Sequence, residues 1–149
     1  MRKLMQASLI AMMFAMPAAW AQTASPIGLW KTIDDETGKP KALVRITEQN
    51  GALEGKIEKL FREPNEDQNP KCVACTDSRK NQPIVGMTIV SGLKKDGNEY
   101  TGGEILDPAK GKVYKSKATL RDGGQKLEVR GYIGAPMFGR SQIWHREQQ

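Results

Sequence analysis

Polar and apolar residues alternate with a period of two along most of this chain, and this alternation constrains the fold more than any other feature. Successive side chains of a β-strand point to opposite faces, so the pattern is typical of strands with one buried face and one solvated face. No segment of the chain shows a convincing helical stripe, and the pattern therefore predicts an all-β fold. The predicted strands are residues 28–33, 41–47, 53–61, 85–93, 99–106, 114–120, 126–133 and 141–146.

Most connections between these strands are short turns. Asn50-Gly51 and Asp96-Gly97 are hairpin signals, and Asp122-Gly123-Gly124 forms a similar turn. An antiparallel sheet of this size with one apolar face can close on itself and lose its edges. The sequence thus predicts a single antiparallel up-and-down β-barrel of about eight strands. A two-sheet β-sandwich is the alternative.

The first 21 residues have the features of a secretory signal peptide. Basic Arg2 and Lys3 precede an apolar run over residues 4–18, and Ala-Trp-Ala then fits the small-x-small cleavage rule. We therefore expect an exported protein, periplasmic or secreted, whose mature domain spans residues 22–149. No later run approaches the ~20 apolar residues that cross a bilayer, so no transmembrane segment is expected after cleavage.

The charge of the mature chain is mildly basic. Two of the 23 lysines and arginines lie in the leader, which leaves 21 against 17 acidic residues, a net charge of about +4. The lysines mostly alternate with apolar residues and form no cluster with stacking aromatics. Nucleic acid is therefore not an expected partner.

Short motifs at the two ends of the mature chain suggest how a barrel would close. Gly28-x-Trp30 opens it, and Arg146 lies near its end. In a closed barrel the first and last strands are neighbours, so Arg146 would stack on Trp30 and donate to nearby carbonyls. This pair resembles the structural signature of lipocalins and related calycins. Arg140 is the alternative arginine for the same role.

A longer series of motifs runs in order along nearly the whole mature chain. The series comprises Gly28-x-Trp30-x-Thr32, Gly38-Lys39, Val44-x-Ile46, Gly55-Lys56-Ile57, Cys72-x-x-Cys75, Pro83-Ile84-Val85-Gly86, Gly102-Gly103-x-Ile105-Leu106-Asp107-Pro108, Gly111-x-x-Tyr114, Leu127-x-Val129-x-Gly131-Tyr132 and Gly139-Arg140-x-x-x-Trp144. It resembles the bacterial exported family called domain of unknown function 2147. The resemblance implies an exported lipocalin-like domain and assigns no reaction and no catalytic residue.

The two cysteines, Cys72 and Cys75, lie in a proline-rich break of the alternation over residues 62–83. A local disulfide is the favoured interpretation, because exported cysteines are normally oxidised. A thiol–disulfide redox pair and a metal site are alternatives, although zinc prefers four ligands and a redox pair a helix N-terminus. Thr76 occupies the position where covalent haem attachment needs histidine. We predict no metal and no cofactor.

The candidate ligand-binding residues are Tyr100, Glu104 and Tyr114, which alternate along two of the predicted strands. An inward Glu104 would be a buried carboxylate in need of a partner, and an outward Glu104 is the open alternative. His145 is the single histidine and stands in the last strand, so no catalytic constellation is predicted.

The expected function is non-catalytic binding of a small, largely apolar ligand in the barrel. Two alternatives remain open from the sequence. One is an envelope protein-interaction module with a filled barrel. The other is a redox protein acting through Cys72 and Cys75.

Overall fold

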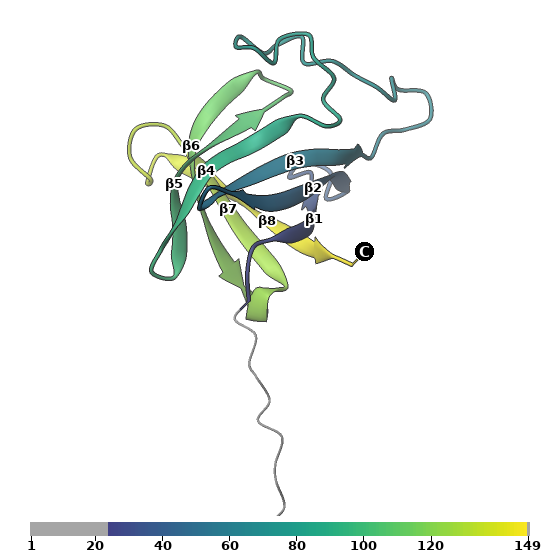
Figure 1. The fold of residues 1–149 in the computed structure, drawn as a ribbon. Coiled ribbons are helices and arrows are strands. Elements are labelled where there is room, and N and C mark those ends of the chain that lie inside the picture. The colour runs from purple at the N-terminus through teal and green to yellow at the C-terminus, as the bar shows by residue number, and fades with distance from the viewer. Residues whose placement is uncertain (1–23, 149) are drawn as a thin grey trace, which may run out of the picture.

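The computed structural model describes residues 24–148, and its eight strands form one closed antiparallel barrel (Figure 1). Each strand pairs with the next in the chain, and the first also pairs with the last. The up-and-down barrel is thereby confirmed over the sandwich. The strands are β1 (Gly28–Ile33), β2 (Pro40–Gln49), β3 (Ala52–Leu60), β4 (Thr88–Asp96), β5 (Glu99–Asp107), β6 (Lys112–Arg121), β7 (Lys126–Tyr132) and β8 (Gly139–Glu147).

The predicted signal peptide, residues 1–21, lies outside the described residues. Within residues 24–148, no helix has the length and apolar character needed to span a bilayer. The one helical element described is a 3₁₀ turn, η1 (Asp122–Gly124), between β6 and β7.

The barrel has two ends that differ in their connections. The terminal end carries the start of β1, the end of β8 and the tight β2–β3, β4–β5 and β6–β7 turns. The loop end carries the β1–β2 turn, the segment 61–87 between β3 and β4, the β5–β6 turn and the β7–β8 loop. Segment 61–87 is the long teal loop at the top right of Figure 1.

The alternation predicted from the sequence places the core inside the barrel. On β2, Ala42, Val44 and Ile46 are buried, whereas the residues between them are half-buried. The hairpin after β2 turns at Asn50 and Gly51, which have φ of 52° and 79°, as the predicted Asn-Gly turn requires.

The fourth strand begins three residues later than the sequence predicts, at Thr88 instead of Val85. The cause is a turn in which the Met87 amide donates to the Ile84 carbonyl at 3.1 Å. The Gly86 amide reaches the Ile57 carbonyl of β3 at 2.7 Å, so this turn ties the end of segment 61–87 to the barrel wall.

Candidate functional site

Trp30 and Arg146 close the terminal end of the barrel. They are opposite each other in the β1–β8 pairing, and the Arg146 guanidinium carbon lies 4.3 Å from the centroid of the Trp30 ring. The fully buried Trp30 donates its indole N–H to the Pro26 carbonyl at 2.8 Å. A Cβ at Gly28 would lie 2.8 Å from Nη1 of Arg146, so the close approach requires glycine. Gly28, Trp30 and Arg146 thus form one structural unit.

The Arg146 guanidinium also satisfies backbone carbonyls at this end. Its Nε donates to Gly124 of η1 at 2.8 Å, Nη1 to Ile27 at 3.1 Å, and Nη2 to Ser25 at 2.6 Å. Burial lowers the pKa of Arg146 from its ordinary value. The geometry gives this closing role to Arg146, whereas the side chain of Arg140 is 69% exposed near the loop end.

Large apolar side chains fill the terminal half of the barrel interior. Trp144 of β8 stands opposite Leu127 of β7, which in turn stands opposite Leu120 of β6. Trp144 and Leu127 are almost completely buried, as is Leu93 of β4. This half of the interior is therefore packed core.

The loop-end half of the inner wall has a different composition. A row of directly opposed residues crosses four strands here: Gly103 of β5, Ser116 of β6, Gly131 of β7 and Arg140 of β8. Opposed residues share one face of a sheet, and the burial of Ser116 identifies this face as the inner one. Gly103 and Gly131 therefore flank Ser116, and the row ends at the exposed Arg140.

The Ser116 hydroxyl is the one buried side-chain polar group of the described residues that has no hydrogen-bond partner. Its residue is completely buried. Buried hydroxyls normally find a partner in protein, water or ligand, and leaving one unpaired costs about 1–3 kcal/mol. The Ser116 hydroxyl is therefore the buried polar group of this inner wall that still lacks a partner.

The two predicted tyrosines both lie on the inner face, at different levels. Tyr114 stands opposite Ile105 one step nearer the loop end than Ser116, and both side chains are half-buried. Tyr100 stands opposite Ala118 on the terminal side and packs against the core. Tyr114 thus belongs to the loop-end wall, and Tyr100 to the packing beneath it.

Glu104 lies on the outer face of the barrel. It stands opposite Ser91 of β4 and Lys115 of β6, and it is exposed. A bulge between Tyr100 and Gly103 shifts the alternation of β5, so Tyr100 and Glu104 do not share a face. Glu104 is therefore not part of the interior site.

A chain of polar contacts runs along the inner face of β8. The Trp144 indole N–H donates to the Gln142 side-chain oxygen at 3.3 Å, and the Gln142 amide donates to the Asp35 carboxylate at 3.1 Å. Arg140 pairs with the same Asp35 oxygen at 3.0 Å. Asp35 comes from the β1–β2 turn, so this contact closes the seam between β1 and β8 beyond their paired residues.

Cys72 and Cys75 form the predicted disulfide, with their Cα atoms 5.4 Å apart. Both are buried in the core cluster that includes Leu106. Cys72 Sγ lies 3.5 Å from the Pro108 carbonyl of the β5–β6 turn, so the disulfide packs against that turn. Both sulfurs belong to buried residues. No group of residues suited to a metal ion occurs within 24–148.

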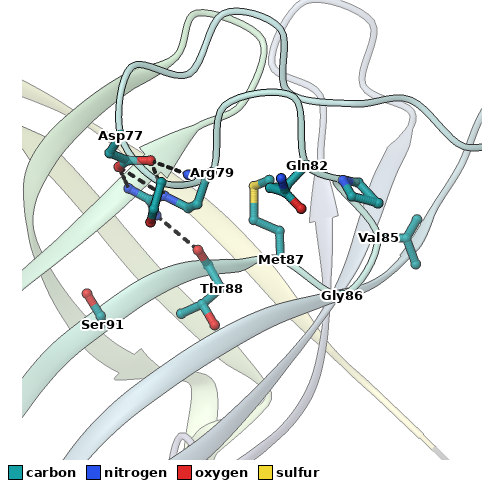
Figure 2. A pocket seen from close by; sticks show the side chains of 10 residues that line it. Asp77, Arg79, Gln82, Val85, Gly86, Met87, Thr88 and Ser91 are labelled. Carbon is teal, nitrogen blue, oxygen red and sulfur yellow. Dashed lines mark hydrogen bonds and ion pairs between the residues drawn. The ribbon is translucent and has the colours of Figure 1, made fainter.

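A hollow on the outer wall lies between segment 61–87 and β4 (Figure 2). Figure 2 shows Arg79 between the Asp77 carboxylate and the Thr88 carbonyl, to which its Nη1 donates at 3.0 Å. The Arg79 hydrogen bonds lower the pKa of Asp77 to about 2. Because Arg79 already has these partners, we assign the hollow to the docking of segment 61–87 on the wall.

Sequence reasoning missed the residues that give the interior site its polar character. Ser116 alternates with Tyr114 and Ala118, which is a signal for its inner face but not for its missing partner. Asp35 stands in a turn, and no pattern in the sequence connects it with Gln142.

The comparisons with known proteins support the fold and the family. No curated protein sequence matches the chain. A solved structure of HP1028 from the human pathogen Helicobacter pylori, described as belonging to the lipocalin family, is similar at 20% identity, with 85% of each chain covered and a TM-score of 0.71. At this identity the likeness shows a lipocalin-like fold. Residues 28–146 match the family described as uncharacterized protein conserved in bacteria (DUF2147), and the chain belongs to that family.

Proposed function

We propose that this protein is an exported, non-catalytic binder of a small, largely apolar molecule that carries one polar group. The molecule would occupy the loop-end half of the barrel interior. The observation that carries the proposal is the Ser116 hydroxyl, fully buried and unpaired, beside a half-buried apolar wall.

The apolar part of such a ligand has a surface to contact. Ile105 and Tyr114 are half-buried although they point to the inside of a closed barrel. Gly131 stands beside them and contributes no side chain, and a Cβ there would lie 3.4 Å from Ile105 and 3.5 Å from Tyr114. Small-ligand sites typically combine such apolar walls with few polar groups.

The polar part of the ligand would meet Ser116 inside the barrel or the Asp35–Gln142–Arg140 group near the loop end. Asp35 holds Gln142 and Arg140 in place before any ligand arrives, and it neutralises the arginine charge. A neutral hydroxyl, amide or ester group therefore suits this wall better than a free anion, because an anion would have to compete with Asp35 for Arg140.

The arrangement favours binding over catalysis. His145, the single histidine of the chain, alternates with the inward Trp144 and so points away from the interior. The two cysteines are joined and lie against the β5–β6 turn. No described group near Ser116 is placed to act as its base, since its neighbours in the row are two glycines.

Native mass spectrometry after incubation with an envelope lipid extract tests the proposal. The chain from residue 22 is compared with a Gly131→Val variant, whose added side chain projects toward Ile105 and Tyr114. Thr119→Val is the control, because it places a valine on the outer face of β6. We expect a bound species on the unmodified chain and on Thr119→Val, and at least tenfold less on Gly131→Val.

Equal binding by Gly131→Val and Thr119→Val, with both variants folded, would place the ligand elsewhere. Absence of any bound species on the unmodified chain would favour the other reading, a filled barrel that acts as an envelope protein-interaction module.

A further inference from the structure

The β7–β8 loop exposes an unusual amount of apolar surface. Ile133 is 57% exposed, Met137 76% and Phe138 69%. The loop projects from the left side of the barrel in Figure 1, where it is drawn in yellow-green. Large apolar side chains gathered at one exposed tip usually mark a contact with a partner or a membrane.

The loop is held in shape by its own hydrogen bonds. The Arg130 guanidinium donates to the Pro136 carbonyl at 2.6 Å and to the Gly139 carbonyl at 3.2 Å. The Phe138 amide donates to the Ala135 carbonyl at 2.9 Å, which closes a turn at the tip. The apolar side chains are therefore presented by an ordered loop, which lowers the entropy lost when they bind.

Strand β6 and the segment that contains this loop carry no acidic residue, although β5 beside β6 does. Residues 108–121 and 129–146 contain no aspartate or glutamate. Lys112 and Lys115 of β6 take part in no ion pair among the described residues, although Asp107 and Glu104 stand opposite them on β5. The cations of the two segments are Lys110, Lys112, Lys115, Lys117, Arg121, Arg130, Arg140 and Arg146.

We propose that the β7–β8 loop docks this protein on an anionic lipid bilayer, with Met137 and Phe138 inserted at the boundary between headgroups and acyl chains. A narrow convex tip with apolar residues suits a fluid interface, whereas a folded partner would need a matching pocket. The exposed lysines of β6 supply the attraction to anionic headgroups. Docking would also place the loop end, with the interior row at Ser116, next to the membrane.

Vesicle cosedimentation tests the docking. The chain starts at residue 22, because all strands lie within residues 28–147 and the apolar leader would bind vesicles by itself. The vesicles contain phosphatidylglycerol and phosphatidylethanolamine, or phosphatidylcholine alone. We expect binding to the anionic vesicles, weaker binding to phosphatidylcholine, and a decrease as salt is added.

The variant Met137→Ser/Phe138→Ser replaces the two apolar side chains at the tip of the loop by polar ones. Ile27→Ser is the control. Ile27 is also an exposed apolar residue, at 44%, but it lies at the terminal end. We expect the double variant to bind anionic vesicles at least tenfold more weakly, since each buried large apolar side chain is worth about a factor of ten. We expect Ile27→Ser to bind as the unmodified chain does.

A Phe138→Trp variant reports the depth of insertion. We expect its added fluorescence to shift to the blue on anionic vesicles and to be quenched by brominated acyl chains. Equal vesicle binding by the double variant and Ile27→Ser would overturn the proposal. Failure of the unmodified chain to bind vesicles would also overturn it. Light scattering would then show whether the loop instead mediates self-association of the chain.

Discussion

Arg146 lies across the Trp30 ring, with its guanidinium carbon 4.3 Å from the ring centroid, while its three nitrogens donate to three backbone carbonyls. The carbonyls belong to the segment before β1 and to η1. One side chain at the end of the last strand thus joins the first strand, the last strand and the β6–β7 turn. This contact closes the terminal end of the barrel, which leaves the loop end as the place for a ligand site.

We predict that Arg146→Ala lowers the free energy of unfolding by about 3 kcal/mol, because hydrogen bonds from a charged donor and the contact with Trp30 are lost together. Urea unfolding measures the effect. Arg140→Ala is the matched control, and we expect it to cost less than about 1 kcal/mol because its ion pair with Asp35 is largely exposed. A larger cost at Arg140 would contradict the assignment of the closing arginine.

Gly111 holds the β5–β6 turn against the disulfide segment. It has φ of +66°, and a Cβ there would overlap the backbone of Ala74. Gly97 in the β4–β5 turn has φ of +62° but open space around its Cα. We predict that Gly97→Ala costs about 1 kcal/mol from φ alone, whereas Gly111→Ala costs at least twice as much. Urea unfolding gives both costs, and limited proteolysis should cut the segment 61–87 faster only in Gly111→Ala.

The Cys72–Cys75 disulfide closes a very short ring, so its effect on the unfolded chain should be small. We predict that reduction lowers the free energy of unfolding by about 2 kcal/mol or less and leaves the barrel folded. The measurement is urea unfolding with and without reductant, with intact mass to verify that two hydrogens are gained. Loss of the β-sheet circular dichroism signal on reduction would show that the disulfide is needed for the barrel to fold, and would contradict this prediction.

The Asp77–Arg79 contact should weaken in acid. The Arg79 hydrogen bonds lower the pKa of Asp77 from 3.8 to about 2 in the folded protein. A carboxyl group whose pKa is lower in the folded state stabilises that state above its unfolded pKa, and the contribution is lost as the pH falls from about 4 to about 2. We expect carbon-detected NMR to place the Asp77 midpoint near 2. In Asp77→Asn, the stability should depend less on pH over that interval.

Much of the fold could be predicted from the sequence, because each strand has one buried and one solvated face. The bounds of β1 agree with the prediction, and closure of the barrel follows from short connections between consecutive strands. The β5 bulge could not be predicted, because Gly102 and Gly103 carry no side chain to show a face. That bulge decides the position of Glu104.

The interior site was harder to predict, because it depends on the register of neighbouring strands and on whether the Ser116 hydroxyl has a hydrogen-bond partner. Tyr114 is visible as an inward aromatic residue, but the opposition of Ser116 to Gly103 and Gly131 requires the pairing of three strands. The contact between Asp35 and Gln142 joins residues 107 positions apart through side chains alone.

The central claim is that the loop-end half of the barrel interior binds a small, largely apolar molecule. The most direct measurement is an NMR titration of the isotope-labelled chain from residue 22 with an envelope lipid extract. The account predicts chemical-shift changes at the amides of Ile105, Ser116 and Gly131, with little change at Thr119 on the outer face. Changes confined to the outer face, or none at all, would contradict it.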